Sequence, residues 1–163
     1  METVELRKRR NALPAHDGGI SVEIDQKVLS SIHSRSDALN GSREIGGLLL
    51  GLRFDEAIQI SKCTFPGTGD KSSKIRFFRN SASHQIAASL WWLRHAGRGD
   101  WVGEWHTHPE RDPKPSAIDV SSWTKLVNHA GKPMVFVIVG FKQTYIAMMH
   151  PGSDQPTRIV IAK

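Results

Sequence analysis

One short stretch of the sequence holds residues that could bind a metal ion. From Gly103 to Trp123 the chain reads GEWHTHPERDPKPSAIDVSSW, with His106 and His108 one residue apart and Asp119 further on. Residues i and i+2 of a strand share a face, so the two histidines are expected to project together. The prolines end that strand, and Asp119 falls in the first turn of the next helix, from which it can reach the imidazoles. Two imidazoles and one carboxylate, with a fourth position open for water, form the ligand set of catalytic zinc.

Each part of this stretch also has a purely structural interpretation. A His-x-His pair in a strand is commonly exposed or hydrogen-bonded without any metal, and Ser116-x-x-Asp119 before an apolar helix is the pattern of a capping box. The combination of these residue types at one spacing favours the metal site. Imidazole and carboxylate suit zinc, although manganese or iron could also bind. We therefore expect one metal ion per chain, with Zn²⁺ as the first choice.

The same residues resemble a known family signature. His106-Thr107-His108-Pro109, followed after five residues by Pro115-Ser116-Ala117-Ile118-Asp119, is similar to the motif of the JAMM (JAB1/MPN+) metalloproteases. That family has an upstream glutamate ahead of a glycine-rich strand, and REIGGLLLGLRF offers Glu44 in front of Gly46-Gly47. The resemblance implies the JAB/MPN fold and peptide-bond hydrolysis.

The resemblance also implies roles for particular residues. His106, His108 and Asp119 would bind zinc, Glu44 would act as general acid/base, and Ser116 would support the oxyanion. Zinc lowers the pKa of its bound water to about 7, and a nearby carboxylate can take the proton as the water attacks an amide.

Two of these positions have alternatives. The Ser116 hydroxyl could cap the helix instead of donating to an oxyanion. Glu104 lies two residues before His106 on the same expected strand face, so it is a rival base or a supporting partner of that histidine. We prefer Glu44 because the family motif has its base there.

Local patterns predict the elements that must position this stretch. We expect helices at 25–39, capped by Asp25 and ending near Asn40-Gly41, at 83–97, capped by Asn80 or Ser81 and closed by Gly97, and at 116–131. Alternating or apolar runs predict strands at 20–24, 44–54, 57–65, 101–108, 133–140, 144–150 and 157–162. This order indicates an α+β fold with a mixed, curved sheet flanked by helices, as in the three-layer α/β/α-like, cytidine-deaminase-like JAB/MPN architecture. We predict a flexible arm at 1–19 and a JAB/MPN metalloprotease domain at 20–163.

Composition and charge limit the classes of protein and of ligand to be considered. The 163 residues suit one domain, and the single cysteine, Cys63, cannot form an internal disulfide or a multi-cysteine zinc site. No apolar run is long enough to cross a bilayer, and the charged N-terminus does not look like a signal peptide, so we expect a cytoplasmic protein without membrane contact. The net charge of +6 favours an acidic partner, yet part of it lies in the run Arg7–Arg10, which is typical of a solvated tail, so we do not expect nucleic acid as the ligand.

Within the family, the short chain without long insertions is most similar to the JAB deconjugases of type II CBASS anti-phage operons. The resemblance implies a zinc-dependent isopeptidase that removes a ubiquitin-like or cGAS-like modifier, gripped by its extended C-terminal tail, from target proteins. Residues 67–80 could pair with such a tail or form a plain solvated loop. The alternatives are a processing peptidase for a sulfur-carrier protein, and a non-catalytic MPN-like or RadC-like scaffold or nucleic-acid-binding module.

Overall fold

The computed structural model describes residues 11–13, 19–38, 44–66 and 82–159. These residues form three helices, α1 (Gln26–Ala38), α2 (Ala82–Arg94) and α3 (Ala117–Ala130). The strands are β1 (Asn11–Leu13), β2 (Ser21–Ile24), β3 (Gly46–Phe54), β4 (Ala57–Cys63), β5 (Gly99–Thr107), β6 (Met134–Val139), β7 (Thr144–Met149) and β8 (Thr157–Arg158).

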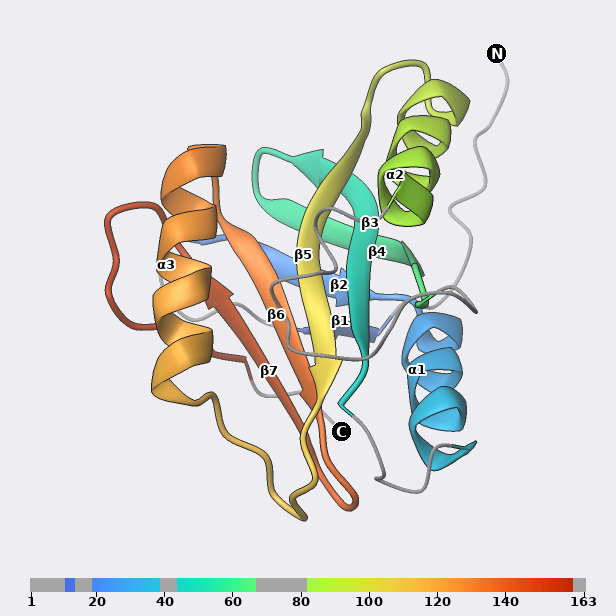
Figure 1. The fold of residues 1–163 in the computed structure, drawn as a ribbon. Coiled ribbons are helices and arrows are strands. Elements are labelled where there is room, and N and C mark those ends of the chain that lie inside the picture. The colour runs from blue at the N-terminus through green and yellow to red at the C-terminus, as the bar shows by residue number, and fades with distance from the viewer. Residues whose placement is uncertain (1–10, 14–18, 39–43, 67–81, 160–163) are drawn as a thin grey trace.

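All eight strands join one sheet in the order β1-β2-β4-β3-β5-β6-β7-β8 (Figure 1). β2 pairs with β4, and β5 with β6, in parallel, while the other neighbours are antiparallel. The pairing of β3 with β5 brings the segment after Glu44 alongside the strand that carries His106. The predicted mixed sheet is confirmed.

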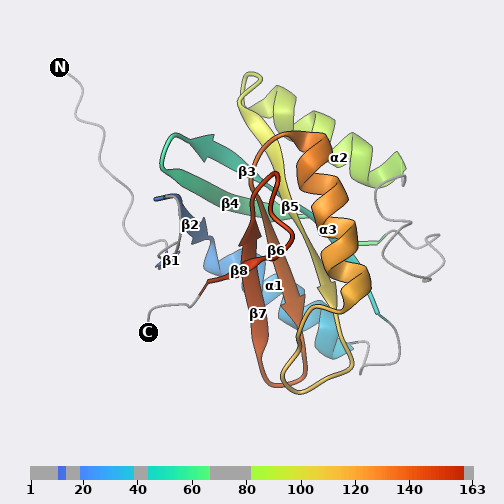
Figure 2. The ribbon, with the colours of Figure 1, turned by 90° about the vertical axis from the view of Figure 1, so that its left-hand side faces the viewer.

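Helices cover both faces of the sheet, and each face has its own apolar core. On one side Val28 and Ile32 of α1 pack among the buried residues of β2, β4 and β6. On the other side Trp123 and Val127 of α3 pack against alternate residues of β6 and β7. Figures 1 and 2 show α1 and α3 on opposite sides of the strands, with α2 beside β3 and β5. This arrangement confirms the predicted α+β fold with three layers.

The helix boundaries follow their capping residues. The Asp25 side chain accepts a hydrogen bond from the amide of Lys27 at 2.9 Å, as expected of an N-cap. Gly97, with φ of 79°, ends α2, and its amide donates to the carbonyl of Trp92 at 2.9 Å. Gly131 ends α3 in the same left-handed region, with φ of 66°. The two C-terminal glycines therefore define where these helices stop.

Some element boundaries differ from the prediction. Asn11–Leu13, inside the predicted arm, pair with β2, because the main-chain groups of that strand are open to a partner on this side. The last strand is described only at Thr157–Arg158. The predicted caps Asn80 and Ser81, the predicted helix end at 40–41 and the loop 67–80 lie outside the described residues. None of the described helices has the length and apolarity that a bilayer crossing requires.

Candidate metal centre

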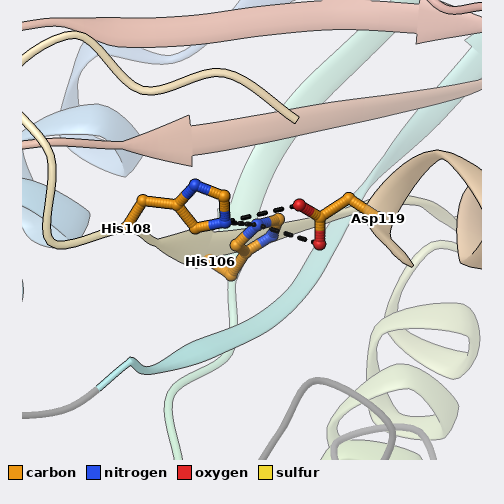
Figure 3. A group of neighbouring side chains, drawn as sticks. All are labelled: His106, His108 and Asp119. Atoms are coloured by element: carbon orange, nitrogen blue, oxygen red, sulfur yellow. Dashed lines mark hydrogen bonds and ion pairs between the residues drawn. The ribbon is translucent and has the colours of Figure 1, made fainter. Parts of the chain in front are cut away.

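The three predicted metal donors come from one end of β5 and the start of α3. His106 is the penultimate residue of β5, His108 follows the strand, and Asp119 lies in the first turn of α3. Figure 3 shows the two imidazoles turned towards the Asp119 carboxylate. His106 and Asp119 are only 3% and 1% exposed, and the His106 ring lies against Trp123 with 6.2 Å between ring centroids. The group is therefore largely shielded from bulk water.

The donor atoms lie close enough together to share one ion. The Nε2 atoms of His106 and His108 lie 3.1 Å apart, and they lie 3.5 and 3.4 Å from the Asp119 carboxylate oxygens Oδ1 and Oδ2, respectively. Ligands bound to zinc at about 2.0–2.1 Å in a tetrahedron are separated by about 3.3 Å. The pairwise separations lie near that value but involve both carboxylate oxygens, and with one atom from each residue the three donors all lie within 4.8 Å of one another. The donor set is one that zinc accepts.

The Asp119 carboxylate takes part in both the helix cap and the donor group. Oδ2 accepts hydrogen bonds from the Ser116 amide and from the Ser116 hydroxyl, both at 2.7 Å. The Ser116 Oγ accepts in turn from the Asp119 amide at 3.2 Å, which completes the capping box. Oδ1 is buried and has no hydrogen-bond partner among the described residues. A buried carboxylate oxygen without a donor is suited to a cation.

The electrostatics of the group keep two of its three donors, His106 and Asp119, in the protonation state that a metal requires. Burial lowers the pKa of His106 to about 4, against the opposing pull of the Asp119 charge, so its imidazole is neutral near pH 7. The hydrogen bond with Asp119 raises the pKa of His108, and burial only partly offsets it. Burial alone would raise the pKa of Asp119, but the hydrogen bond with His108, the His106 charge and the bonds from Ser116 lower it to about 2. Asp119 is therefore ionised at neutral pH.

Glu44 lies beside this group at the entry to β3. Its side chain is exposed, and its negative charge contributes to the raised pKa of His108. The glycines after it are required by close packing. A Cβ on Gly46 would lie 2.5 Å from the Trp105 carbonyl oxygen, and one on Gly47 would lie 2.1 Å from that of Thr64. The glycine pair thus lets β3 approach its neighbours closely beside Glu44.

The rival base Glu104 occupies a different environment. It lies within β5, in register with Leu48 and Phe136, and is 6% exposed. Glu104 is not a member of the donor group formed by the two histidines and Asp119. Its place in the interior of the sheet suits a supporting role rather than proton transfer at the surface.

Two supports of the site could not be read from the sequence pattern. Thr107, between the histidines, is bonded to Ile45 through its main chain and its hydroxyl. The turn between β6 and β7 holds the loop after His108, because the amides of Phe141 and Gln143 donate to the Glu110 and Arg111 carbonyl oxygens at 2.7 and 2.9 Å. Both contacts join segments far apart in sequence, so no local signal could have identified them.

Comparisons with known proteins show the family to which the chain belongs. Residues 25–151 match the family described as prokaryotic homologs of the JAB domain. A Pseudomonas aeruginosa protein named "CD-NTase/cGAS isopeptidase" is 34% identical over 143 residues, covering 86% of this chain and 90% of that protein. An Escherichia coli protein of the same name is 34% identical and covers 77% of this chain and 80% of its own length.

Solved structures support the fold alone. The solution structure of a Desulfitobacterium hafniense protein superimposes with a TM-score of 0.59 at 16% identity, covering 83% of this chain and 87% of that one. With the match to residues 25–151 and the relatives at 34% identity, the fold and the sequence lead to one assignment: this chain belongs to the prokaryotic JAB-domain family.

Proposed function

We propose that this protein is a zinc-dependent isopeptidase that releases a conjugated ubiquitin-like or cGAS-like modifier from target proteins in anti-phage defence. The spacing of the three donor atoms is the observation that carries the metal-dependent part of the proposal. The modifier is proposed from the relatives, which are named CD-NTase/cGAS isopeptidases. The partner is accordingly a protein conjugate joined through the C-terminal tail of the modifier.

In this proposal, His106, His108 and Asp119 Oδ1 would hold the ion, and the ion would supply a water of lowered pKa for hydrolysis. The neutral imidazole of His106 and the ionised carboxylate of Asp119 are ready to bind without first losing a proton at pH 7.

Glu44 would carry the proton in the reaction. Its carboxylate would accept a proton from the attacking water and return it to the leaving amine nitrogen, so that the peptide or isopeptide C–N bond breaks with proton balance. Its exposed position at the rim agrees with access to a bulky protein substrate. Ser116 would donate its hydroxyl hydrogen to the developing oxyanion, which requires that hydroxyl to turn away from Asp119 Oδ2.

The decisive experiment compares metal content with cleavage. We expect wild type and Glu44→Gln to carry one zinc ion per chain by mass spectrometry, and His108→Ala to carry none. A CD-NTase-like protein joined through its C-terminus to a second protein serves as substrate, and only the wild type should separate the two. Zinc retained at full stoichiometry in His108→Ala would contradict the ligand assignment, and cleavage by Glu44→Gln would contradict the base.

The same assay separates the remaining functions. A sulfur-carrier protein with a C-terminal extension shares the chemistry, so preferential cleavage of that precursor would replace the proposed substrate while keeping the mechanism. A protein without zinc that binds DNA in a salt-dependent manner would instead be a scaffold or nucleic-acid-binding module.

A further inference from the structure

The clearest unassigned contact near the site joins Thr107 to Ile45. The Thr107 amide donates to the Ile45 carbonyl oxygen at 2.8 Å, and the Ile45 amide donates to the Thr107 hydroxyl oxygen at 3.0 Å. Ile45 and Thr107 are 7% and 6% exposed, so water cannot readily replace either bond. Both polar groups of Ile45 are thus satisfied by one residue that lies 62 positions away.

The Thr107 hydroxyl accepts the hydrogen bond that a main-chain carbonyl oxygen would accept if the pairing of β3 with β5 continued regularly. Gly46 pairs with His106 in the antiparallel ladder, so Ile45 lies opposite Thr107 at the next step. In a regular ladder the two residues of a hydrogen-bonded pair exchange main-chain bonds only. Here a side chain receives the Ile45 amide, and β3 begins only at Gly46. The hydrogen bonds between Thr107 and Ile45 therefore fix the main chain directly after Glu44.

We propose that Thr107 is a positioning residue, which holds Glu44 against the metal centre through the main chain of Ile45. The inference rests on the proposed role of Glu44 as the general base. Thr107 lies between the two candidate histidine donors, and Ile45 directly follows Glu44. The hydrogen bonds between Thr107 and Ile45 therefore set how far Glu44 lies from the candidate metal centre. The Glu44 side chain is exposed among the residues that the structure describes, so its position depends strongly on the main chain that carries it. Loss of the hydroxyl leaves a buried amide without a partner, and the segment must shift to satisfy it.

The chain offers a matched control at Thr64. Its buried hydroxyl also accepts a hydrogen bond from a β3 amide, that of Leu48, at 2.8 Å, and its own amide donates to the Leu48 carbonyl oxygen at 3.0 Å. The bonds to β3 are therefore of the same kind as at Thr107, but Leu48 lies two residues inside β3 and does not adjoin Glu44. The Thr64 hydroxyl also contacts Nδ1 of the buried His84 at 2.5 Å. Thr64→Val therefore reports the stability cost of losing a buried threonine hydroxyl that bonds β3, with the contact to His84 included.

The test measures kcat, KM and bound zinc for Thr107→Val, Thr107→Ser and Thr64→Val with the joined CD-NTase-like substrate. We expect Thr107→Val to lower kcat about 10- to 100-fold, since a shift of about 1 Å in a catalytic group has that effect. Zinc content and KM should stay near those of wild type. Thr107→Ser, which keeps the hydroxyl, should restore kcat, and Thr64→Val should lose thermal stability with an unchanged kcat. If Thr107→Val does not fold, Thr107→Ala serves in its place.

Distinct results would overturn the inference. A normal kcat in Thr107→Val with a reduced Tm would make Thr107 a structural residue only, and a kcat in Thr107→Ser as low as in Thr107→Val would show that the hydroxyl is not the determinant. Absence of cleavage by zinc-loaded wild type and Thr64→Val alike would overturn the proposed function itself, and this inference with it.

Discussion

Ser116 and Asp119 share three hydrogen bonds, and these bonds determine what each side chain can still do. Oδ2 of Asp119 accepts the two bonds of the helix cap, which fixes the rotamer so that Oδ1 lies 3.5 Å from His106 Nε2 and Oδ2 lies 3.4 Å from His108 Nε2. The Ser116 hydroxyl both accepts from the Asp119 amide and donates to its carboxylate. At the scale of single residues, the capping box and the candidate metal site therefore share the Asp119 side chain and do not exclude one another.

Ser116→Ala is expected to show both roles of that hydroxyl. Loss of the N-cap should lower the free energy of unfolding by about 1 kcal/mol in urea titrations. Loss of an oxyanion donor should lower kcat about 10²-fold at saturating zinc. Ser121→Ala, at an exposed position in α3, is the control and should change neither quantity. Reduced stability with a normal kcat would leave Ser116 as a helix cap alone.

At the scale of elements, the turn between β6 and β7 acts as a support for the loop that separates His108 from Asp119. The His108 amide donates to the Val139 carbonyl oxygen at 3.0 Å, and the next residues of that turn hold Glu110 and Arg111. Gly140 sits against this loop so closely that a Cβ would lie 2.4 Å from the Glu110 carbonyl oxygen and 2.7 Å from Cδ of the buried Pro113. The loop can keep its course only while position 140 lacks a side chain.

Gly140→Ala should therefore weaken metal binding without touching a ligand. The added methyl group must displace the loop, and changes that disturb the support of metal ligands typically cost about 10- to 100-fold in affinity. Competition with a chelator of known affinity measures the effect. Lys142→Ala, in the same turn and exposed, keeps its main-chain bond to Arg111 and should bind zinc as wild type does. Equal affinities in both variants would contradict the supporting role of the turn.

The ion pairs of Asp100 should make the stability of the fold depend on pH. Asp100 of β5 accepts hydrogen bonds from Arg53 Nε at 2.5 Å and from Lys132 Nζ at 2.7 Å, which tie β3 and the start of β6 to β5. Burial raises the pKa of Asp100, but the bonds from Lys132 and Arg53 outweigh it and bring the pKa below the usual 3.8. A lowered folded pKa means that the stabilisation is present above the usual value and is lost as the pH falls below it.

Asp100→Asn should accordingly have a lower Tm than wild type at pH 7, and this difference in Tm should become smaller as the pH falls below about 4. Thermal unfolding followed by circular dichroism across pH 3–7 measures this difference. Asp154→Asn, at an exposed position, should show no such gap. A gap that stays constant over the whole range would mean that the ionised carboxylate of Asp100 contributes nothing.

At the scale of the whole molecule, the sequence predicted those elements whose positions are set by local patterns. The helices with Asp25, Gly97 and Ser116 at their ends, and the runs that form β3 to β7, follow from capping chemistry and apolar periodicity. The strand order could not be predicted, because it depends on pairings between distant segments, and β1 is too short to carry a pattern. The spacing of His106, His108 and Asp119 predicted a common group, and the structure brings them together. No sequence pattern predicted the hydrogen bond from the Ile45 amide to the Thr107 hydroxyl.

The long-range pairing of β3 with β5 also has a consequence for how the protein matures. All three candidate donors lie between His106 and Asp119, so bringing them together closes only a short loop, whereas Glu44 arrives through a contact that spans 62 residues between Ile45 and Thr107. Contacts of high sequence separation form late in folding. With the roles proposed above, a newly made chain would assemble its candidate donors before it acquires Glu44, and a half-folded copy that had captured an ion would still be unable to cut the proteins around it.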